Sequence, residues 1–227
     1  MTDQSTIHQI FFNIGKGELN EIPGFNWTHQ KTKLYCDQNN IKNILWSRDD
    51  VEDLLEDYPE YKELYDNFRY DIQRIDFARL LILYHHGGLY LDLDVQVFEH
   101  VNLDEIFEKD FFIARWWTSH LPYNAIMGCH PKNKLMLSIL KEVERSYEEK
   151  SKMKIYETRT ARFVFHTTGH YAIHRAIKGK VEYSPVVSVY NPQKKICDCV
   201  PDKKALFFDG SASVWYTKQS SREKKEK

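Results

Sequence analysis

The chain has 227 residues, a formal charge of −1 and 42% hydrophobic residues. That length suffices for one domain with its own core. The near-zero charge argues against a nucleic-acid-binding protein, which would carry a basic excess. Because we find no secretory leader and no apolar run of the roughly 18 residues that a membrane span needs, we expect a cytoplasmic protein.

The cysteines are scattered, which favours reduced thiols in a reducing compartment over a disulfide framework. They are Cys36, Cys129, Cys197 and Cys199. The last two could form half of a zinc site, but no second pair stands at finger spacing, so we expect no such site.

Apolar runs separated by loop signals predict alternating strands and helices in the first part of the chain. Strands are expected at residues 7–12, 42–46 and 89–95, and helices at residues 27–39, 48–58, 60–67 and 70–86. Ser47 can cap the second helix, with Asp50 at capping-box spacing. Gly87 and Gly88 end the fourth helix.

The alternation continues in the second part of the chain. Helices are expected at residues 103–107, 133–149 and 170–177, and strands at residues 111–114, 124–127, 186–190 and 206–208. This order indicates an α/β domain with a mainly parallel sheet. We expect a single domain over residues 1–218 and a charged, disordered tail over residues 219–227.

Two aspartates follow the glycine pair, in the run GGLYLDLD at residues 87–94. On a strand, Tyr90, Asp92 and Asp94 share one face while the leucines between them point into the core. The two carboxylates would lie roughly 7 Å apart at a strand end, where parallel sheets bind ligands. Two neighbouring anions favour a hard divalent cation such as Mg²⁺ or Mn²⁺. The alternative is a solvated strand end with no ligand.

The preceding helix adds an acid and a base near the same place. Asp76 and Arg79 stand three residues apart and therefore share a helix face. They could be an ordinary ion pair, but the helix passes through the glycine pair directly into the aspartate-bearing strand. We therefore treat all four charged residues as one candidate site.

The run from Asp76 to Asp94 resembles the D-x-x-R…LY-x-x-GG-x-Y-x-D-x-D block of family 32-type glycosyltransferases. These include initiating mannosyltransferases, capsular polysaccharide sugar transferases and, distantly, clostridial glucosylating toxins. Weaker similarities lie at residues 7–10, 45–46, 124, 130–131, 168–169 and 210–215. His170 stands where the family has a proline.

The resemblance implies a GT-A fold, an α/β nucleotide-binding sandwich with a central, mainly parallel sheet flanked by helices. It also implies transfer of a hexose from a UDP- or GDP-sugar, with retention and with Mn²⁺ or Mg²⁺, to a hydroxyl of a glycan, glycolipid or protein. Asp92 and Asp94 would hold the metal, and Asn124 would line the reaction centre. Asp209 stands where many members have a histidine that contacts the metal, and an aspartate is a suitable hard ligand.

The resemblance assigns the remaining site residues to the donor. Asp76 and Arg79 would hold hydroxyls of the donor sugar, and Asp92 would also contact the donor. Ser213 and Trp215 would close over the diphosphate and sugar. The residues implied for the base and ribose pocket are His8, Gln9 and Trp46.

Two other functions remain open at the level of sequence. One is a non-catalytic module that binds a nucleotide sugar or glycan. The other is an Asp-x-Asp phosphatase or phosphotransferase, which would usually have Thr or Val where Gln96 stands. The aromatic stretch Arg115–Trp117 with His120 could be an acceptor platform or a packed surface loop. The basic tail could give weak membrane docking.

Overall fold

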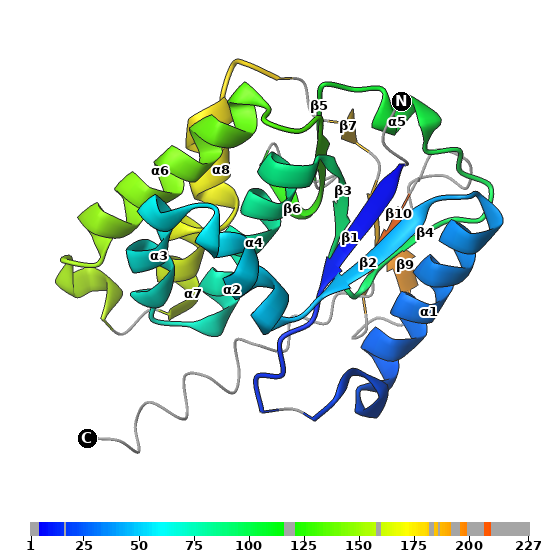
Figure 1. Cartoon of the computed structure of the whole chain (residues 1–227), viewed down its shortest axis with the longest axis horizontal. Helices are drawn as coiled ribbons and strands as arrows, with labels where there is room; N and C mark the ends of the chain where they lie inside the picture. Colours follow the sequence, from blue (N-terminus) through cyan, green and yellow to red (C-terminus); the bar gives the residue numbers. More distant parts are fainter. Residues whose placement is uncertain are drawn as a thin grey trace.

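The computed structural model describes residues 5–15, 17–115, 121–157, 160–181, 184–185, 187–191, 196–198 and 207–209. Within these ranges the chain forms a six-stranded sheet, a four-stranded sheet and flanking helices (Figure 1). No helix in this part of the chain is both long and apolar enough to span a bilayer.

The central sheet has the strand order β2-β1-β3-β6-β5-β7. Its strands are β1 (Thr6–Ile10), β2 (Lys42–Trp46), β3 (Gly88–Leu91), β5 (Phe111–Arg115), β6 (Pro122–Cys129) and β7 (Ser184–Pro185). β1 runs parallel to both β2 and β3, and β7 runs parallel to β5. β6 is antiparallel to both of its neighbours. The α/β class with a mostly parallel sheet is therefore confirmed.

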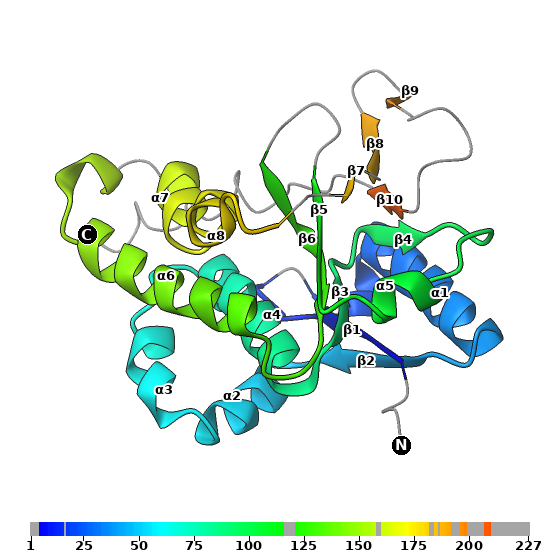
Figure 2. The same cartoon turned by 90° about the horizontal axis from the view of Figure 1, so that it is seen from above.

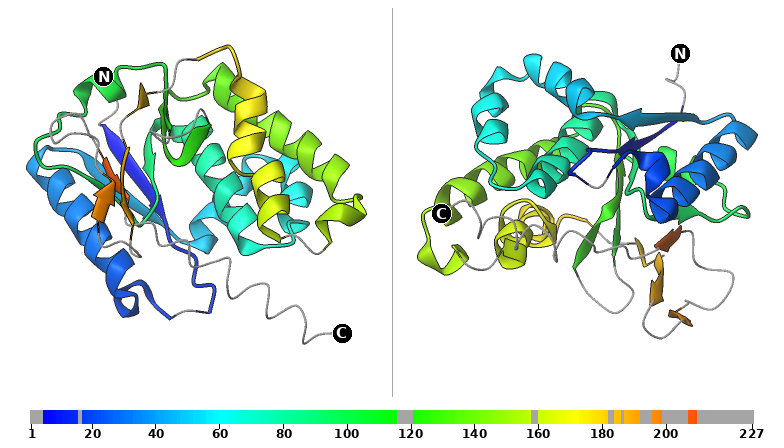
Figure 3. Two further views of the ribbon diagram at one scale, coloured as in Figure 1. Left: turned by 180° about the vertical axis from the view of Figure 1, so that it is seen from behind. Right: turned by 90° about the horizontal axis from the view of Figure 1, so that it is seen from below.

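Helices cover both faces of this sheet (Figures 2 and 3). The larger helical layer packs on one face and consists of α2 (Arg48–Glu56), α3 (Pro59–Asp66), α4 (Asp71–His86), α6 (Lys134–Lys150), α7 (Thr160–Thr167) and α8 (His170–Ile177). The other face carries α1 (Pro23–Gln38), the short α5 (Asp104–Phe107) and the second sheet. Each layer has its own buried core, so the central strands are enclosed from both sides.

Local sequence signals explain the boundaries that position the site. Ser47 caps α2 as predicted, because its hydroxyl accepts from the Asp50 amide at 3.2 Å and the Asp50 carboxylate accepts from the Ser47 amide at 2.8 Å. α4 ends at Gly87, whose φ is 70°. A Cβ at Gly87 would lie 2.6 Å from the Pro131 ring, so only glycine fits at this reversal.

The prediction of one continuous strand over residues 89–95 is wrong. β3 ends at Leu91, and Asp92–Asp94 form a turn closed by the Val95 amide, which donates to the Asp92 carbonyl at 2.9 Å. The next strand, β4 (Val95–Val97), belongs to the second sheet. Buried and partly exposed residues nevertheless alternate from residue 91 to 97, across the turn, so the periodicity alone could not reveal the break.

The second sheet has the order β4-β10-β8-β9. Its other members are β8 (Val187–Asn191), β9 (Ile196–Asp198) and β10 (Phe207–Asp209). β8 and β10 lie within one residue of the predicted strands. α7, β7, β9 and two 3-10 turns, η1 (Leu19–Glu21) and η2 (Lys154–Tyr156), were not predicted. α1 begins earlier than predicted because Pro23 is well suited to the first helical turn.

Candidate active site

A buried arginine joins most of the predicted charged residues. The Arg79 side chain is 3% exposed and its guanidinium lies 3.1 Å from a carboxylate oxygen of Asp76 and 3.1 Å from one of Asp92. It also donates to the Asn124 carbonyl at 2.9 Å. Its charge lies 4.9 Å from the centre of the Tyr90 ring, a favourable cation–π contact. The structure thus brings together Asp76, Arg79, Asp92 and Asn124, which we call the arginine cluster.

The helix–strand reversal explains why Arg79 and Asp92 meet. Arg79 lies eight residues before Gly87, or about 12 Å along a helix. Asp92 lies four residues after Gly88, or about 13 Å along an extended chain. Because α4 and β3 run in opposite directions on either side of the glycine pair, the two side chains come level with one another.

Both carboxylate oxygens of Asp76 have polar partners. Its carboxylate accepts from the Asn124 amide at 3.1 Å and from the Thr168 hydroxyl at 2.8 Å, in addition to its ion pair with Arg79. Burial raises the pKa of Asp76 to about 6, against the opposing effect of the Arg79 charge. At neutral pH the carboxylate is therefore mostly ionised and fixed in orientation.

Asp92 is the partly exposed member of the arginine cluster, with 29% of its side chain accessible. It accepts from the Tyr90 hydroxyl at 2.6 Å, and its backbone amide donates to the Ala125 carbonyl at 2.9 Å. Burial raises the pKa of Tyr90 well above its ordinary value, so the phenol keeps its proton and remains a donor. The backbone of Asp92 is therefore fixed, while part of its carboxylate remains accessible.

Asp94 lies two residues farther along the same turn and is also partly exposed. The turn is tied to α1, because the Thr28 hydroxyl donates to the Leu93 carbonyl. Asp92 and Asp94 thus place two partly exposed carboxylates on one turn. Neighbouring carboxylates favour a cation between them.

These donors fit a hard divalent metal ion such as Mg²⁺ or Mn²⁺, which prefers carboxylate oxygens. Across the described ranges, no three His, Cys, Asp or Glu side chains gather in a way that could hold a metal. Asp92 and Asp94 would therefore supply only part of the coordination shell, leaving room for phosphate oxygens and water.

The third predicted metal contact lies on a neighbouring strand. β10 pairs with β4 so that the backbone of Asp209 stands opposite Val95, one residue beyond Asp94. The Asp209 side chain lies outside the description, as do Ser213 and Trp215 and the possible acceptor stretch at residues 115–117 and 120, of which only the Arg115 backbone is described.

The residues predicted for the base and ribose pocket lie in other surroundings. His8 is 1% exposed; its Nε2 lies 3.1 Å from the Gly87 carbonyl and its Nδ1 accepts from the Trp46 indole at 3.1 Å. Burial lowers the pKa of His8 to about 3, so it is neutral. Gln9 is fully buried, with its side-chain oxygen 2.7 Å from Nδ1 of His29. These contacts are internal, and the structure does not bring His8 or Gln9 into the arginine cluster.

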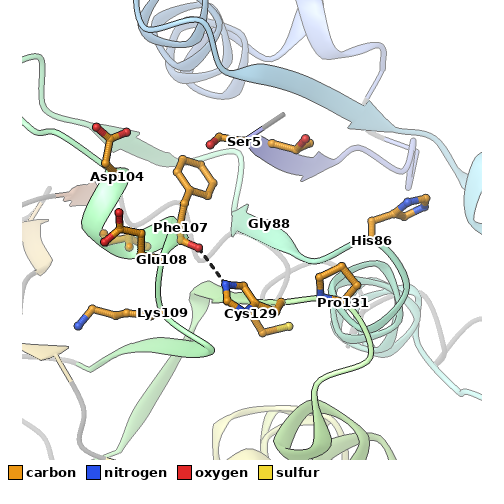
Figure 4. Close-up of a pocket in the computed structure, with 12 residues that line it drawn as sticks. Ser5, His86, Gly88, Asp104, Phe107, Glu108, Lys109, Cys129 and Pro131 are labelled. Atoms are coloured by element: carbon orange, nitrogen blue, oxygen red, sulfur yellow. Dashed lines mark hydrogen bonds between the residues drawn. The ribbon is translucent and has the colours of Figure 1, made fainter. Parts of the chain in front are cut away.

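A cavity of about 400 Å³ lies at the opposite edge of the central sheet, where β1 and β3 begin (Figure 4). It is lined by residues that include Ser5, His86, Asp104, Glu108 and Lys109. The length of β3 separates this cavity from Asp92. Parallel sheets bind ligands at the other edge, so we do not assign the reaction to this cavity.

The sequence does not identify Tyr90 and Thr168 as site residues. For Tyr90, its position in the motif block, on the same strand face as Asp92, is the signal that could have indicated this role. For Thr168, the only signal is the weak similarity of residues 168–169 to the family. No local pattern links Thr168 to Asp76, because 92 residues separate them.

Residues 24–112 match the model of a family described as a glycosyltransferase sugar-binding region containing a DXD motif. This segment includes Asp76, Arg79, Asp92 and Asp94. Residues 24–112 of this chain are therefore similar to the sugar-binding region of DXD glycosyltransferases. The resemblance found in the sequence is thereby confirmed.

Two relatives illustrate the similarity. The chain is 34% identical over 110 residues to an uncharacterized glycosyltransferase, L373, of Acanthamoeba polyphaga mimivirus, covering 45% of this chain and 42% of that protein. It is 29% identical over 140 residues to inositol phosphoceramide mannosyltransferase 3 of Schizosaccharomyces pombe, covering 61% and 36%. The chain thus spans less than half the length of these curated relatives.

The fold is also similar to a solved structure. A glycosyltransferase involved in glycosylation of the major capsid of PBCV-1 superposes with a TM-score of 0.52 at 15% identity, covering 96% of this chain and all of that one. This likeness is one of fold alone, and it confirms the expected GT-A fold. At that identity it carries no information on substrates.

Proposed function

We propose that this protein is a metal-dependent glycosyltransferase that moves a hexose from a UDP- or GDP-sugar to a hydroxyl acceptor. The observation that carries the proposal is the arginine cluster at the carboxyl end of β3, inside the segment that matches a sugar-binding region. The mannosyltransferase relative supports GDP-mannose as the first donor to test, and its name supports an inositol ring as one acceptor. We propose residues 1–218 as the catalytic domain.

The residues divide into an outer and an inner group. Asp92 and Asp94, both partly exposed, would hold Mn²⁺ or Mg²⁺, with Asp209 as a further contact. Asp76 and Arg79 are almost completely buried, so they would meet donor hydroxyls only at the edge of the cluster. Their larger contribution is to fix the position of Asp92. Asn124 links both inner residues and would line the reaction centre.

The proposed reaction replaces one bond at the anomeric carbon of the sugar by another. The bond to the donor phosphate oxygen breaks and a bond to the acceptor oxygen forms. The acceptor proton passes to the departing diphosphate, and attack on the same face gives retention. A bound divalent metal ion would supply positive charge to the diphosphate as it leaves. Arg79 is committed to Asp76 and Asp92, so it orients these carboxylates.

The test is release of free nucleoside diphosphate from GDP-mannose, UDP-glucose, UDP-galactose and UDP-GlcNAc, with Mn²⁺, with Mg²⁺ and with a chelator. We expect turnover with at least one donor and its loss on chelation. Binding of a nucleotide sugar without release would support the non-catalytic module. Release of inorganic phosphate from phosphoesters, without consumption of any nucleotide sugar, would support the phosphatase alternative.

A further inference from the structure

Thr168, in the corner between α7 and α8, joins that corner to the arginine cluster. The Thr168 hydroxyl donates to Asp76 at 2.8 Å, and the neighbouring Thr167 hydroxyl accepts from the Gln73 side chain at 2.8 Å. A Cβ on Gly169 would lie 3.0 Å from the Phe165 backbone, so the chain packs tightly where α8 begins. The Thr168–Asp76 hydrogen bond therefore joins the turn just before α8 to α4.

Four rings are in contact around this corner. The ring centres of Phe165 and His170 are 4.6 Å apart, those of His170 and Tyr171 are 4.5 Å apart, and those of His166 and Tyr171 are 4.6 Å apart. His166 and Tyr171 are stacked, with an interplanar angle of 27°. We call Phe165, His166, His170 and Tyr171 the corner rings. They support one another, so their orientation is fixed before any ligand binds.

Tyr171 is the exposed member of the corner rings, with 37% of the residue accessible. Tyr171 is the third residue after Thr168, so trans peptide geometry keeps their Cα atoms within about 11 Å. A ligand on Tyr171 would therefore lie close to the residue that binds Asp76. Burial lowers the pKa of His170 to about 4 and also lowers that of His166, so this surface presents neutral rings.

We propose that the corner rings form the acceptor-binding surface and that Tyr171 stacks on a hydroxylated ring of the acceptor, a hexose or a cyclitol. A flat aromatic face next to a phenolic hydroxyl suits such a ring, which has apolar C–H faces and polar edges. The proposal rests on the glycosyltransferase function proposed above and adds the substrate class of the second site.

The test separates donor chemistry from acceptor binding. Donor hydrolysis by water is measured without an acceptor, and transfer is measured with methyl α-mannoside and with myo-inositol. We expect Tyr171→Ala to lower kcat/KM for the acceptor about tenfold, the effect of losing one stacked ring, and to change hydrolysis less than about twofold. Tyr171→Phe keeps the ring and should retain most transfer.

Trp27→Ala is the matched control, because Trp27 is an exposed aromatic residue on α1, 53% accessible. It should change neither hydrolysis nor transfer. Equal losses of hydrolysis and transfer in Tyr171→Ala, or no loss of either, would overturn the proposal.

Saturation-transfer NMR with the same two acceptors reports binding without turnover. A wild-type protein that consumes no donor would refute the proposed function. Acceptor signals that are absent in the wild type, or equal in the wild type and Tyr171→Ala, would refute the role of the corner rings.

Discussion

Replacing Arg79 by lysine tests whether the arginine cluster is a working site or an internal ion pair. The guanidinium reaches Asp76, Asp92 and the Asn124 carbonyl from one planar group, whereas an ammonium cannot hold the same fork geometry. Arg79→Lys preserves the charge and so avoids two unpaired carboxylates. Arg79→Ala would leave both carboxylates unpaired, which costs about 3–5 kcal/mol of stability for a broken buried pair.

The magnitude follows from the contacts that lysine gives up. Losing one charge-assisted hydrogen bond in a buried cluster costs about 2 kcal/mol. With a urea dependence of about 2 kcal/mol per molar, the unfolding midpoint should fall by about 1 M. Since domains are stable by about 5–15 kcal/mol, Arg79→Lys should still fold.

Ligand binding then decides the role of Arg79. Isothermal titration calorimetry without a divalent metal should show at least tenfold weaker binding of the cognate nucleotide sugar and nearly unchanged binding of the free nucleoside diphosphate. Lys33→Ala, on an exposed ion pair of α1, is a control that should change neither. Equal weakening of both ligands in Arg79→Lys would refute a donor-sugar role and leave a structural ion pair.

Three further changes probe the arginine cluster and the residues next to it. Asp94→Ala should leave the fold intact, because the side chain is partly exposed, and remove most donor hydrolysis in Mn²⁺; near wild-type turnover would contradict the metal site. Tyr90→Phe removes the hydroxyl that donates to Asp92 and should lower kcat/KM about tenfold at a stability cost of about 1–2 kcal/mol; unchanged kcat/KM would show that Asp92 keeps its position without it. The pKa of Asp76 is raised to about 6 in the folded protein, so its protonated form adds stability below pH 4 that is lost as pH rises through 6. Urea titrations between pH 4 and 7 should show the wild type losing stability relative to Asp76→Asn, and a constant difference would contradict the assignment.

The sequence predicted the elements that its local chemistry determines. The Ser47 cap and the glycine pair are local signals, and the structure has α2 and the end of α4 where they indicate. The Asp76–Arg79 pairing also follows from helix periodicity. These features depend on residues only a few positions apart, which a single sequence displays directly.

The features that the sequence did not show depend on distant parts of the chain. β3 ends at Leu91 because the chain then enters the second sheet as β4. The partner of β4 is β10, which comes more than one hundred residues later in the sequence. The periodicity of residues 89–97 is the same whether they form one strand or two. Likewise, the burial of His8 and Gln9 depends on Trp46, Gly87 and His29, which come from three other parts of the chain.

The turn at Asp92–Asp94 is held from several directions at once. Tyr90 and Arg79 hold the Asp92 side chain, Thr28 holds the Leu93 carbonyl, and β10 pairs with the strand that leaves the turn. Asp92 is therefore fixed by α4 and β3, whereas the chain after Asp94 is fixed by the second sheet. A metal ion that joins Asp92 to Asp94 would thus connect α4 and the central sheet to the second sheet. Binding of that ion should then raise the unfolding midpoint of the wild type but not of Asp94→Ala, because only the wild type supplies both anchors.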